Sequence, residues 1–269
     1  MCKRTTADPL VRMFLDRYGL NLLSIPREKA SVGDLYVDDG RHTSAPGSVE
    51  YFLDPPVEIP PPTTNEHMAD VAGEISDAVA VSAGLGLLEG FLAALGAGGV
   101  ISKVRAGYTA KKTESLRFHL DDATRDSVDP MRLGSLLAGH HPVPGHPMWS
   151  PSNRYYLVTA VARTPSITVI AKDDRSHTVD VDVEVIKLAT VSTGVSVDGS
   201  SDVGITYKGA KKLAFGVELM ELAFDSESGA VKLTVPDQAV TVRGSEGSVP
   251  SIGRDFIGSP EGDAFLALA

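Results

Sequence analysis

Three histidines lie within seven residues of one another, at His140, His141 and His146. Imidazoles at such short spacing can bind a transition metal, which makes this cluster the strongest candidate for metal chemistry in the chain. Prolines stiffen the loop between them, and no acid or cysteine lies among the three. The composition therefore favours a solvent-exposed loop over a metal centre.

Other catalytic patterns fail on their spacing. The glycine run at residues 84–90 has one residue too many for a dinucleotide fingerprint, and no Walker lysine, zinc-protease pair or nucleophile elbow is present. The acidic pairs at residues 38–39, 121–122 and 173–174 lack the spacing of a calcium loop. Cys2, the only cysteine, has no fixed base to activate it so close to the terminus. The sequence predicts a protein that is not an enzyme. A hydrolase that uses His140 or His141 stays as an alternative hypothesis.

The composition narrows the choice of partners. The chain has 269 residues, of which 42% are hydrophobic, and 35 acidic against 25 basic residues give a formal net charge of −10. Such an acidic chain is poorly suited to bind nucleic acid, or anionic lipid by simple attraction. A single cysteine favours a reducing compartment, and the first residues lack the apolar run of a secretory signal. We therefore expect a cytoplasmic protein.

Residues 78–102 are apolar enough to raise the question of a membrane span, because Glu89 is their only charge. Six glycines and this central acid are unfavourable for a constitutive transmembrane helix. We expect a buried segment instead.

The first half of the chain mixes helices and short strands. Residues 10–23 have helical apolar spacing, with Asp8 as N-cap, Pro9 at the first helical position and Gly19 as a terminator; Ile25-Pro26 ends this unit. A short strand is expected at 32–37, an extended proline-rich connector at 54–65, a helix-leaning segment at 70–95 and a strand at 117–120. Asp129-Pro130 begins a short helix that runs to Leu137.

From Arg154 to about Val242 the chain is dominated by strands. Strands are expected at 155–161, 167–171, 203–207, 213–224 and 231–235, with a break at 164–166 and turns at 198–201 and 226–229. This order predicts an α+β fold with a central twisted, mainly antiparallel sheet and peripheral helices.

In the middle of this region, valines and mainly acidic residues alternate, so that they lie on opposite faces of a strand. The apolar positions are Val179, Val181, Val183, Val185, Val195, Val197, Val203 and Ile205. The pattern fits a half-buried strand pair of an ordinary sandwich, and it also fits a membrane hairpin with one face in lipid and one in water. Residues 178–187 would extend about 33 Å, or about 25 Å along the membrane normal at barrel tilt.

The last segment separates into a linker and an apolar tail. The Gly/Ser-rich linker, residues 244–253 with Arg254 after it, consists of Gly244, Ser245, Glu246, Gly247, Ser248, Val249, Ser251, Ile252 and Gly253 around one proline. The large apolar groups that follow are Phe256, Ile257, Phe265, Leu266 and Leu268. An exposed tail rarely carries so many of them, so we expect residues 254–269 to dock on the body, residues 1–243.

Three stretches resemble the gasdermin pore-forming domain, in the same order and spacing. They are RYYLVTAVAR from Arg154, KGAKKLAFGV from Lys208 and LVRMFLDRYGL from Leu10. The resemblance covers roughly residues 8–242 and is to the short bacterial gasdermins, because no long helical domain follows Val242.

This resemblance implies an autoinhibited precursor of a membrane pore. Cys2 would carry palmitate in place of any cofactor, and a caspase-like protease would cut the linker and release the inhibitory peptide, residues 254–269. The cytoplasmic monomer would then become a homo-oligomer in the inner membrane. Two hairpins, within residues 69–125 and 168–208, would refold into a large β-barrel that kills the cell and halts phage spread.

One departure from animal members is the charge. Arg254 against Glu246, Asp255, Glu261 and Asp263 gives the linker and tail together −3, which leaves −7 on the body. Membrane insertion is therefore not expected to depend on attraction to acidic lipid. The alternative function is a soluble, non-enzymatic α+β binding or scaffold module.

Overall fold

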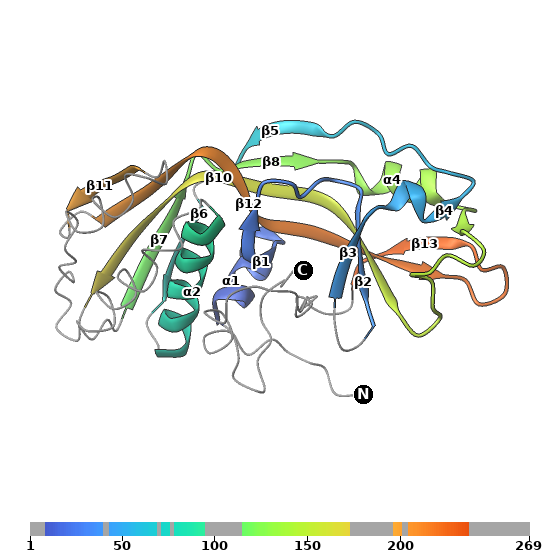
Figure 1. The fold of residues 1–269 in the computed structure, drawn as a ribbon, viewed down its shortest axis with the longest axis horizontal. Coiled ribbons are helices and arrows are strands. Elements are labelled where there is room, and N and C mark those ends of the chain that lie inside the picture. The colour runs from blue at the N-terminus through green and yellow to red at the C-terminus, as the bar shows by residue number, and fades with distance from the viewer. Residues whose placement is uncertain are drawn as a thin grey trace.

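A computed structural model describes residues 9–39, 43–68, 71–75, 78–94, 115–172, 196–200 and 204–236. A long, curved antiparallel sheet forms the centre of the molecule, with helices packed against it (Figure 1). This arrangement confirms the predicted α+β class with a mainly antiparallel sheet.

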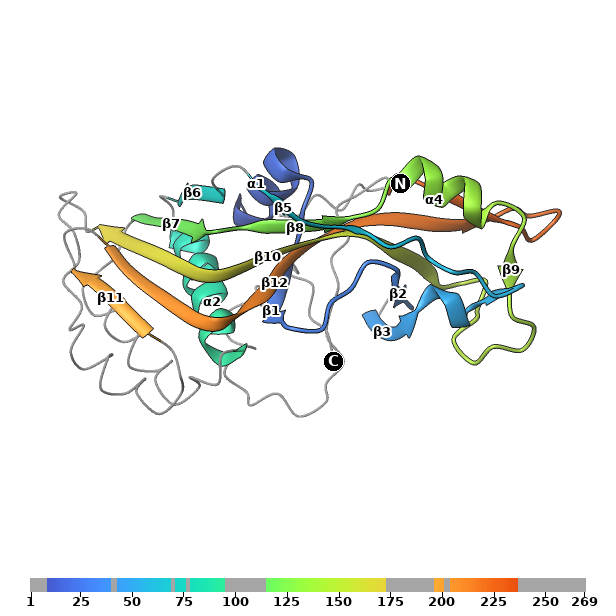
Figure 2. The same ribbon diagram turned by 90° about the horizontal axis from the view of Figure 1, so that it is seen from above.

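Two strands run the length of the sheet. β10 (Arg154–Lys172) and β12 (Gly204–Phe224) have 19 and 21 residues and pair antiparallel from Tyr156↔Glu221 to Val169↔Ile205. The predicted break at residues 164–166 is wrong, because β10 passes through Pro165 as a register irregularity between Thr164 and Ser166. Proline is tolerated there because a bulge needs no ladder hydrogen bond. Both β10 and β12 are curved along their length (Figure 2).

The remaining strands flank this pair along its length. On the β10 side lie β2 (Asp34–Asp38) with β3 (Thr43–Ser48), β8 (Thr124–Ser127) with β5 (Thr63–His67), and β7 (Ser115–Asp121) with β6 (Val71–Ile75). On the β12 side lie β1 (Asn21–Arg27), β11 (Ser196–Ser200) and β13 (Val231–Thr234). A separate short pair joins β4 (Leu53–Asp54) to β9 (His141–Pro142).

The helices are α1 (Pro9–Tyr18), α2 (Ala78–Ala94) and α4 (Pro130–Leu137), with a 3-10 turn η1 at Val49–Tyr51. The predicted start of α4 is confirmed: the Asp129 side chain accepts a hydrogen bond from the backbone N–H of Met131, 2.9 Å away. Gly19 ends α1 with a φ of +69°, as predicted. None of the described helices is long and apolar enough to cross a membrane.

Three other boundaries differ from the sequence predictions. The helical spacing seen over residues 10–23 does not continue as a helix beyond Gly19, because Leu22 and Leu23 are buried in β1 against β12. The segment 70–95 begins as β6 before it becomes helical. Residues 198–200, predicted as part of a turn, lie in β11.

Candidate functional site

Five strands meet at one end of the molecule, in the order β6-β7-β10-β12-β11 (Figure 1). We call this part the distal sheet; β10 contributes residues 166–172 and β12 contributes residues 204–208. All its pairings are antiparallel: Ala72 lies opposite His119, and Val169 opposite both Phe118 and Ile205. Each strand of the distal sheet therefore runs in the opposite direction to its neighbours.

The distal sheet has one apolar and one polar face, because strand side chains alternate. The apolar face consists of side chains no more than 5% exposed: Val71, Leu116, Phe118, Leu120, Ile167, Val169, Ala171, Val197, Ile205 and Tyr207. The opposite face carries Glu74, Arg117, His119, Thr168, Thr206 and Asp198, which are half-buried or exposed. Such an amphipathic sheet needs a cover over its apolar side when it is in water.

Helices α2 and α1 provide that cover. Leu85, Leu87, Leu88, Phe91 and Leu92 of α2, with Val11 and Phe14 of α1, are buried in the same cluster as the apolar face of the distal sheet. A helix that is apolar on all sides is stable in water only when it is buried. Each large side chain that α2 buries contributes about 1.5–3 kcal/mol, so removal of the helix from the sheet carries a large cost in water.

The polar face is connected by hydrogen bonds rather than by packing. The Asp121 carboxylate accepts from the hydroxyls of Thr168, at 2.8 Å, and Ser166, at 3.3 Å, and also contacts the His119 ring. The Thr168 and Thr206 hydroxyls lie 2.7 Å apart, which links β10 to β12. At the margin, Glu74 and Arg117 form an ion pair at 2.8 Å. Water can cover this face without breaking the hydrogen bonds between its own side chains.

Charged side chains tie the strands together where the sheet bends. The Arg163 guanidinium, 17% exposed, binds the Asp126 carboxylate at 3.1 Å and donates to the backbone carbonyls of Glu28, at 3.0 Å, and Ala30. Nearby, Arg125 donates to Glu218 at 2.7 Å, from β8 to β12 across β10. Burial raises the pKa of the Glu218 carboxyl, and Arg125 offsets only part of that rise.

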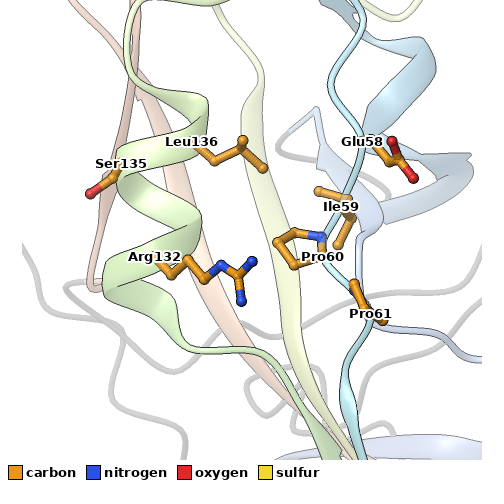
Figure 3. A pocket seen from close by; sticks show the side chains of 7 residues that line it. All are labelled: Glu58, Ile59, Pro60, Pro61, Arg132, Ser135 and Leu136. Carbon is orange, nitrogen blue, oxygen red and sulfur yellow. The ribbon is translucent and has the colours of Figure 1, made fainter.

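Away from the distal sheet, a groove of about 450 Å³ lies between α4 and the proline-rich connector (Figure 3). Its lining contains one carboxylate, Glu58, and one guanidinium, Arg132, with no nucleophile and base pair among the lining residues. The histidine loop lies at the same end, where the His146 ring packs edge-on against Phe52 at 5.2 Å. Among the described residues, no three metal-ligating side chains converge.

Comparison with known proteins decides the family. The family model for the Bacterial Gasdermin Family matches residues 23–230, well over half of the chain. This chain belongs to the bacterial gasdermin family. Gasdermins form membrane pores and are not enzymes, so the amphipathic distal sheet is the part of this gasdermin that fits the family's activity.

Individual relatives align with this chain over nearly their whole length. A gasdermin of Vitiosangium sp. is 27% identical over 243 residues, which are 85% of this chain and 89% of the relative. A gasdermin of Gillisia limnaea is 21% identical over 87% of this chain and 91% of its own. The solved structure of a bacterial gasdermin from Bradyrhizobium tropiciagri superimposes with a TM-score of 0.61 at 17% identity, over 89% of this chain and 97% of that one. That likeness supports the gasdermin fold.

Few of the predicted site residues fall within the described residues. Val197 and Ile205 do: both are buried on the apolar face, and Val197 pairs with Tyr207. Cys2, the linker residues 244–254, the tail residues 256–268, and Val179, Val181, Val183, Val185, Val195 and Val203 lie outside the described residues and stay predictions. Sequence reasoning missed Asp121, whose neighbours come from β7 and β10, and Tyr18, which contacts β6.

Proposed function

We propose that this gasdermin is the autoinhibited precursor of a pore in the bacterial inner membrane. A caspase-like protease cuts between residues 244 and 254, the inhibitory peptide (residues 254–269) leaves, and the body oligomerises as a large β-barrel. The death of the cell then limits phage spread. The observation that carries the proposal is the amphipathic distal sheet, whose apolar face is covered by helices.

A membrane barrel requires strands with one lipid-facing and one water-facing side. The distal sheet already has both sides, with Phe118, Val169 and Ile205 on one and Thr168 and Thr206 on the other. If α2 and α1 move away, lipid can replace them against the apolar face, while the hydroxyl-rich face lines water. No side chain needs to change its direction relative to the strand.

The sequence beyond the described strands continues the same alternation. Val179, Val181, Val183 and Val185 are all separated from Val169 by an even number of residues, as Val203 is from Ile205 and Val195 is from Val197 of β11. Strand side chains repeat every second residue, so unbroken extension of β10, β11 and β12 puts these valines on the apolar face. This parity supports residues 168–208 as the second membrane hairpin.

Extension is also what the bilayer thickness requires. β7 has 7 residues, whereas a transmembrane strand needs about 9–11. β7 therefore has to lengthen at the distal end. In this mechanism α2 and the rest of residues 69–125 supply the first hairpin, which accounts for a segment both apolar and rich in glycine.

The tail and the acyl chain set the threshold for this change. Five large apolar groups, Phe256, Ile257, Phe265, Leu266 and Leu268, stabilise the closed state by about 1.5–3 kcal/mol for each one fully buried. A single palmitoyl group on Cys2 gives only marginal, reversible membrane binding, so it biases the cleaved body toward lipid without anchoring the precursor. Assembly of many protomers multiplies this bias.

The test uses the full chain with the recognition sequence of a site-specific protease in place of residues 246–252. Dye-filled vesicles of phosphatidylethanolamine and phosphatidylglycerol should leak only after the protease is added, and rings should be visible by electron microscopy. Leakage from the uncut chain at the same rate, or sealed vesicles after complete cleavage, would contradict the proposal and favour a soluble scaffold module.

Three controls assign the switch to its parts. The unmodified chain with the same protease should stay inactive, which excludes an effect of the protease itself. A chain with Phe265→Ala and Leu266→Ala should leak without cleavage, because the closed state loses apolar contacts. Cys2→Ala should slow leakage after cleavage in acylated material and change nothing in material without the acyl chain.

A further inference from the structure

The outermost strand of the distal sheet, β6, pairs only with β7 among the described strands. In an antiparallel pair, alternate residues of an edge strand direct both backbone N–H and C=O away from the partner strand. Ala72 is such a residue, because its nitrogen and its oxygen each lie 3.2 Å from the same hydroxyl outside the sheet.

That hydroxyl belongs to Tyr18, the last residue of α1. Tyr18 Oη accepts from the Ala72 N–H and donates to the Ala72 carbonyl, so one side chain satisfies both outward groups of this residue. Arg17 adds a weaker donor, with Nη1 3.5 Å from the Ala72 oxygen, and its guanidinium lies 5.3 Å from the Tyr18 ring centroid. The Tyr18 hydroxyl thus occupies the place that another strand would take.

Helix α1 is held closely against this edge (Figure 2). Phe14 stacks on Phe118 of β7 with ring centroids 5.6 Å apart. A Cβ at Gly73 would lie 2.5 Å from the Phe118 ring and 2.8 Å from Met13, so β6 approaches α1 as closely as only glycine allows. The end of α1 is therefore positioned by packing, and the hydroxyl is aimed at the β6 backbone.

We propose that the β6 edge is a docking surface for a second copy of this chain, and that Tyr18 is its removable cap. An open strand edge is a template for pairing, and a closed barrel has no edges left, so each protomer has to offer one edge to the next. A second copy that adds a strand here continues both faces of the distal sheet without a change of register. The inference rests on the proposed pore formation and adds the surface that α1 guards.

The cap is weak enough to be displaced. It consists of two hydrogen bonds between neutral, partly buried groups, each a modest net contribution in water. An incoming strand replaces them with its own backbone N–H and C=O. Tyr18 thus slows edge pairing in the monomer and does not prevent it once copies gather on a membrane.

Two variants at this contact should act in opposite directions. Tyr18→Phe keeps the ring, and with it the contacts to Phe14 and Arg17, but removes the hydroxyl from Ala72. Ala72→Pro also removes the bond from this N–H to Tyr18, but it takes away the outward N–H that a second copy needs, so the edge cannot pair there even when the cap is weakened. An outward-facing edge position is where a strand tolerates proline. Loss of the fold would change the lag before dye release in the same direction for both variants.

The experiment uses the protease-cleavable full chain described above, on the same vesicles. After cleavage, the lag before dye release should shorten about fivefold to a hundredfold for Tyr18→Phe, the range given by two lost hydrogen bonds, and lengthen for Ala72→Pro. Hydrogen exchange at the Ala72 amide should speed up in uncut Tyr18→Phe. Tyr51→Phe is the matched control, because that ring is 79% exposed on η1; it should match the parent chain.

Each outcome bears on one of the two proposals. If the cleaved parent leaks and Tyr18→Phe has an unchanged or longer lag, or Ala72→Pro an unchanged or shorter one, the cap is overturned and pore formation stands. If no cleaved chain leaks, the proposed function fails, and the cap on barrel assembly fails with it.

Discussion

At the scale of single residues, Arg163 shows how one side chain fixes the path of three segments. Its guanidinium holds the Asp126 carboxylate on β8 and two carbonyls of the loop between β1 and β2. The planar fork of arginine can satisfy several acceptors at once, whereas a lysine ammonium on a flexible stem cannot match that geometry. The loop is therefore tied to the bend of β10 by a contact that depends on the residue type.

Arg163→Lys should lower the free energy of unfolding by about 1–3 kcal/mol, because two carbonyls lose a charged donor. Thermal or chemical denaturation of the uncut chain measures this. Lys211→Ala is the control: Lys211 binds Glu28 at 2.8 Å in the same loop but is 65% exposed. Its removal should change the stability by at most about 0.5 kcal/mol. Equal effects of the two variants would show that the guanidinium geometry is unimportant.

Glu218 gives the chain a pH dependence of predictable sign. Burial raises the pKa of its carboxyl above 4.5, so the folded chain takes up this proton more readily than the unfolded chain. The stabilisation is therefore complete below the unfolded value and is lost as the pH rises through the raised pKa. Relative to Glu218→Gln, the melting temperature of the parent chain should fall as the pH rises from about 4 to 8.

Glu74→Gln provides the opposite sign in the same measurement. Arg117 lowers the pKa of the exposed Glu74 carboxyl, so its contribution is present at neutral pH and is lost on acidification. The melting temperature of the parent chain relative to Glu74→Gln should rise with pH. Differences of the same sign for both variants would mean that the burial of Glu218 does not control its titration.

At the scale of elements, the bend of β10 is built from a threonine and a proline. Thr164 is fully buried; its hydroxyl accepts from the Ser166 N–H at 3.1 Å and lies 2.7 Å from the carbonyls of Asp121 and Ser166. The hydroxyl thus replaces ladder bonds that are absent beside Pro165. A strand that would otherwise end there continues into the distal sheet.

Thr164→Val keeps the shape but removes this hydroxyl. Because the Ser166 N–H loses its acceptor in a buried site, we expect a loss of about 1–3 kcal/mol in unfolding free energy. Thr234→Val is the control, since the Thr234 hydroxyl makes one long bond of 3.4 Å at a half-buried site. A change for Thr164→Val no larger than for Thr234→Val would assign the bend to Pro165 alone.

These elements also show what the sequence can predict. The short helix at Asp129–Leu137 was predictable because its cap and proline are local signals. β1 was not, because Ile25-Pro26 normally ends an element; here the proline lies in an irregular part of an edge strand, between Leu22 and Arg27. The alternation of valines with acidic residues predicted the apolar face through Val197 and Ile205. The cover by α2 and the Tyr18 contact could not be predicted, since they depend on which helix packs on which edge.

At the scale of the whole molecule, charge constrains how the cleaved body meets lipid. The chain carries −10, and the body, residues 1–243, carries −7. Anionic headgroups attract basic segments by about 1 kcal/mol per Lys or Arg and repel acidic surfaces in the same way. Apolar burial of the distal sheet, rather than charge attraction, therefore has to drive insertion.

Vesicle composition and salt test this directly. Cleaved protein should permeabilise zwitterionic phosphatidylcholine vesicles at least as fast as vesicles rich in phosphatidylglycerol. Raising the ionic strength from about 0.05 to 0.5 M shortens the screening length severalfold, so it should speed leakage of the anionic vesicles and leave the zwitterionic ones nearly unchanged. If anionic lipid accelerated leakage and salt slowed it, a basic patch on the body would govern binding, and the apolar face of the distal sheet would act only after electrostatic docking.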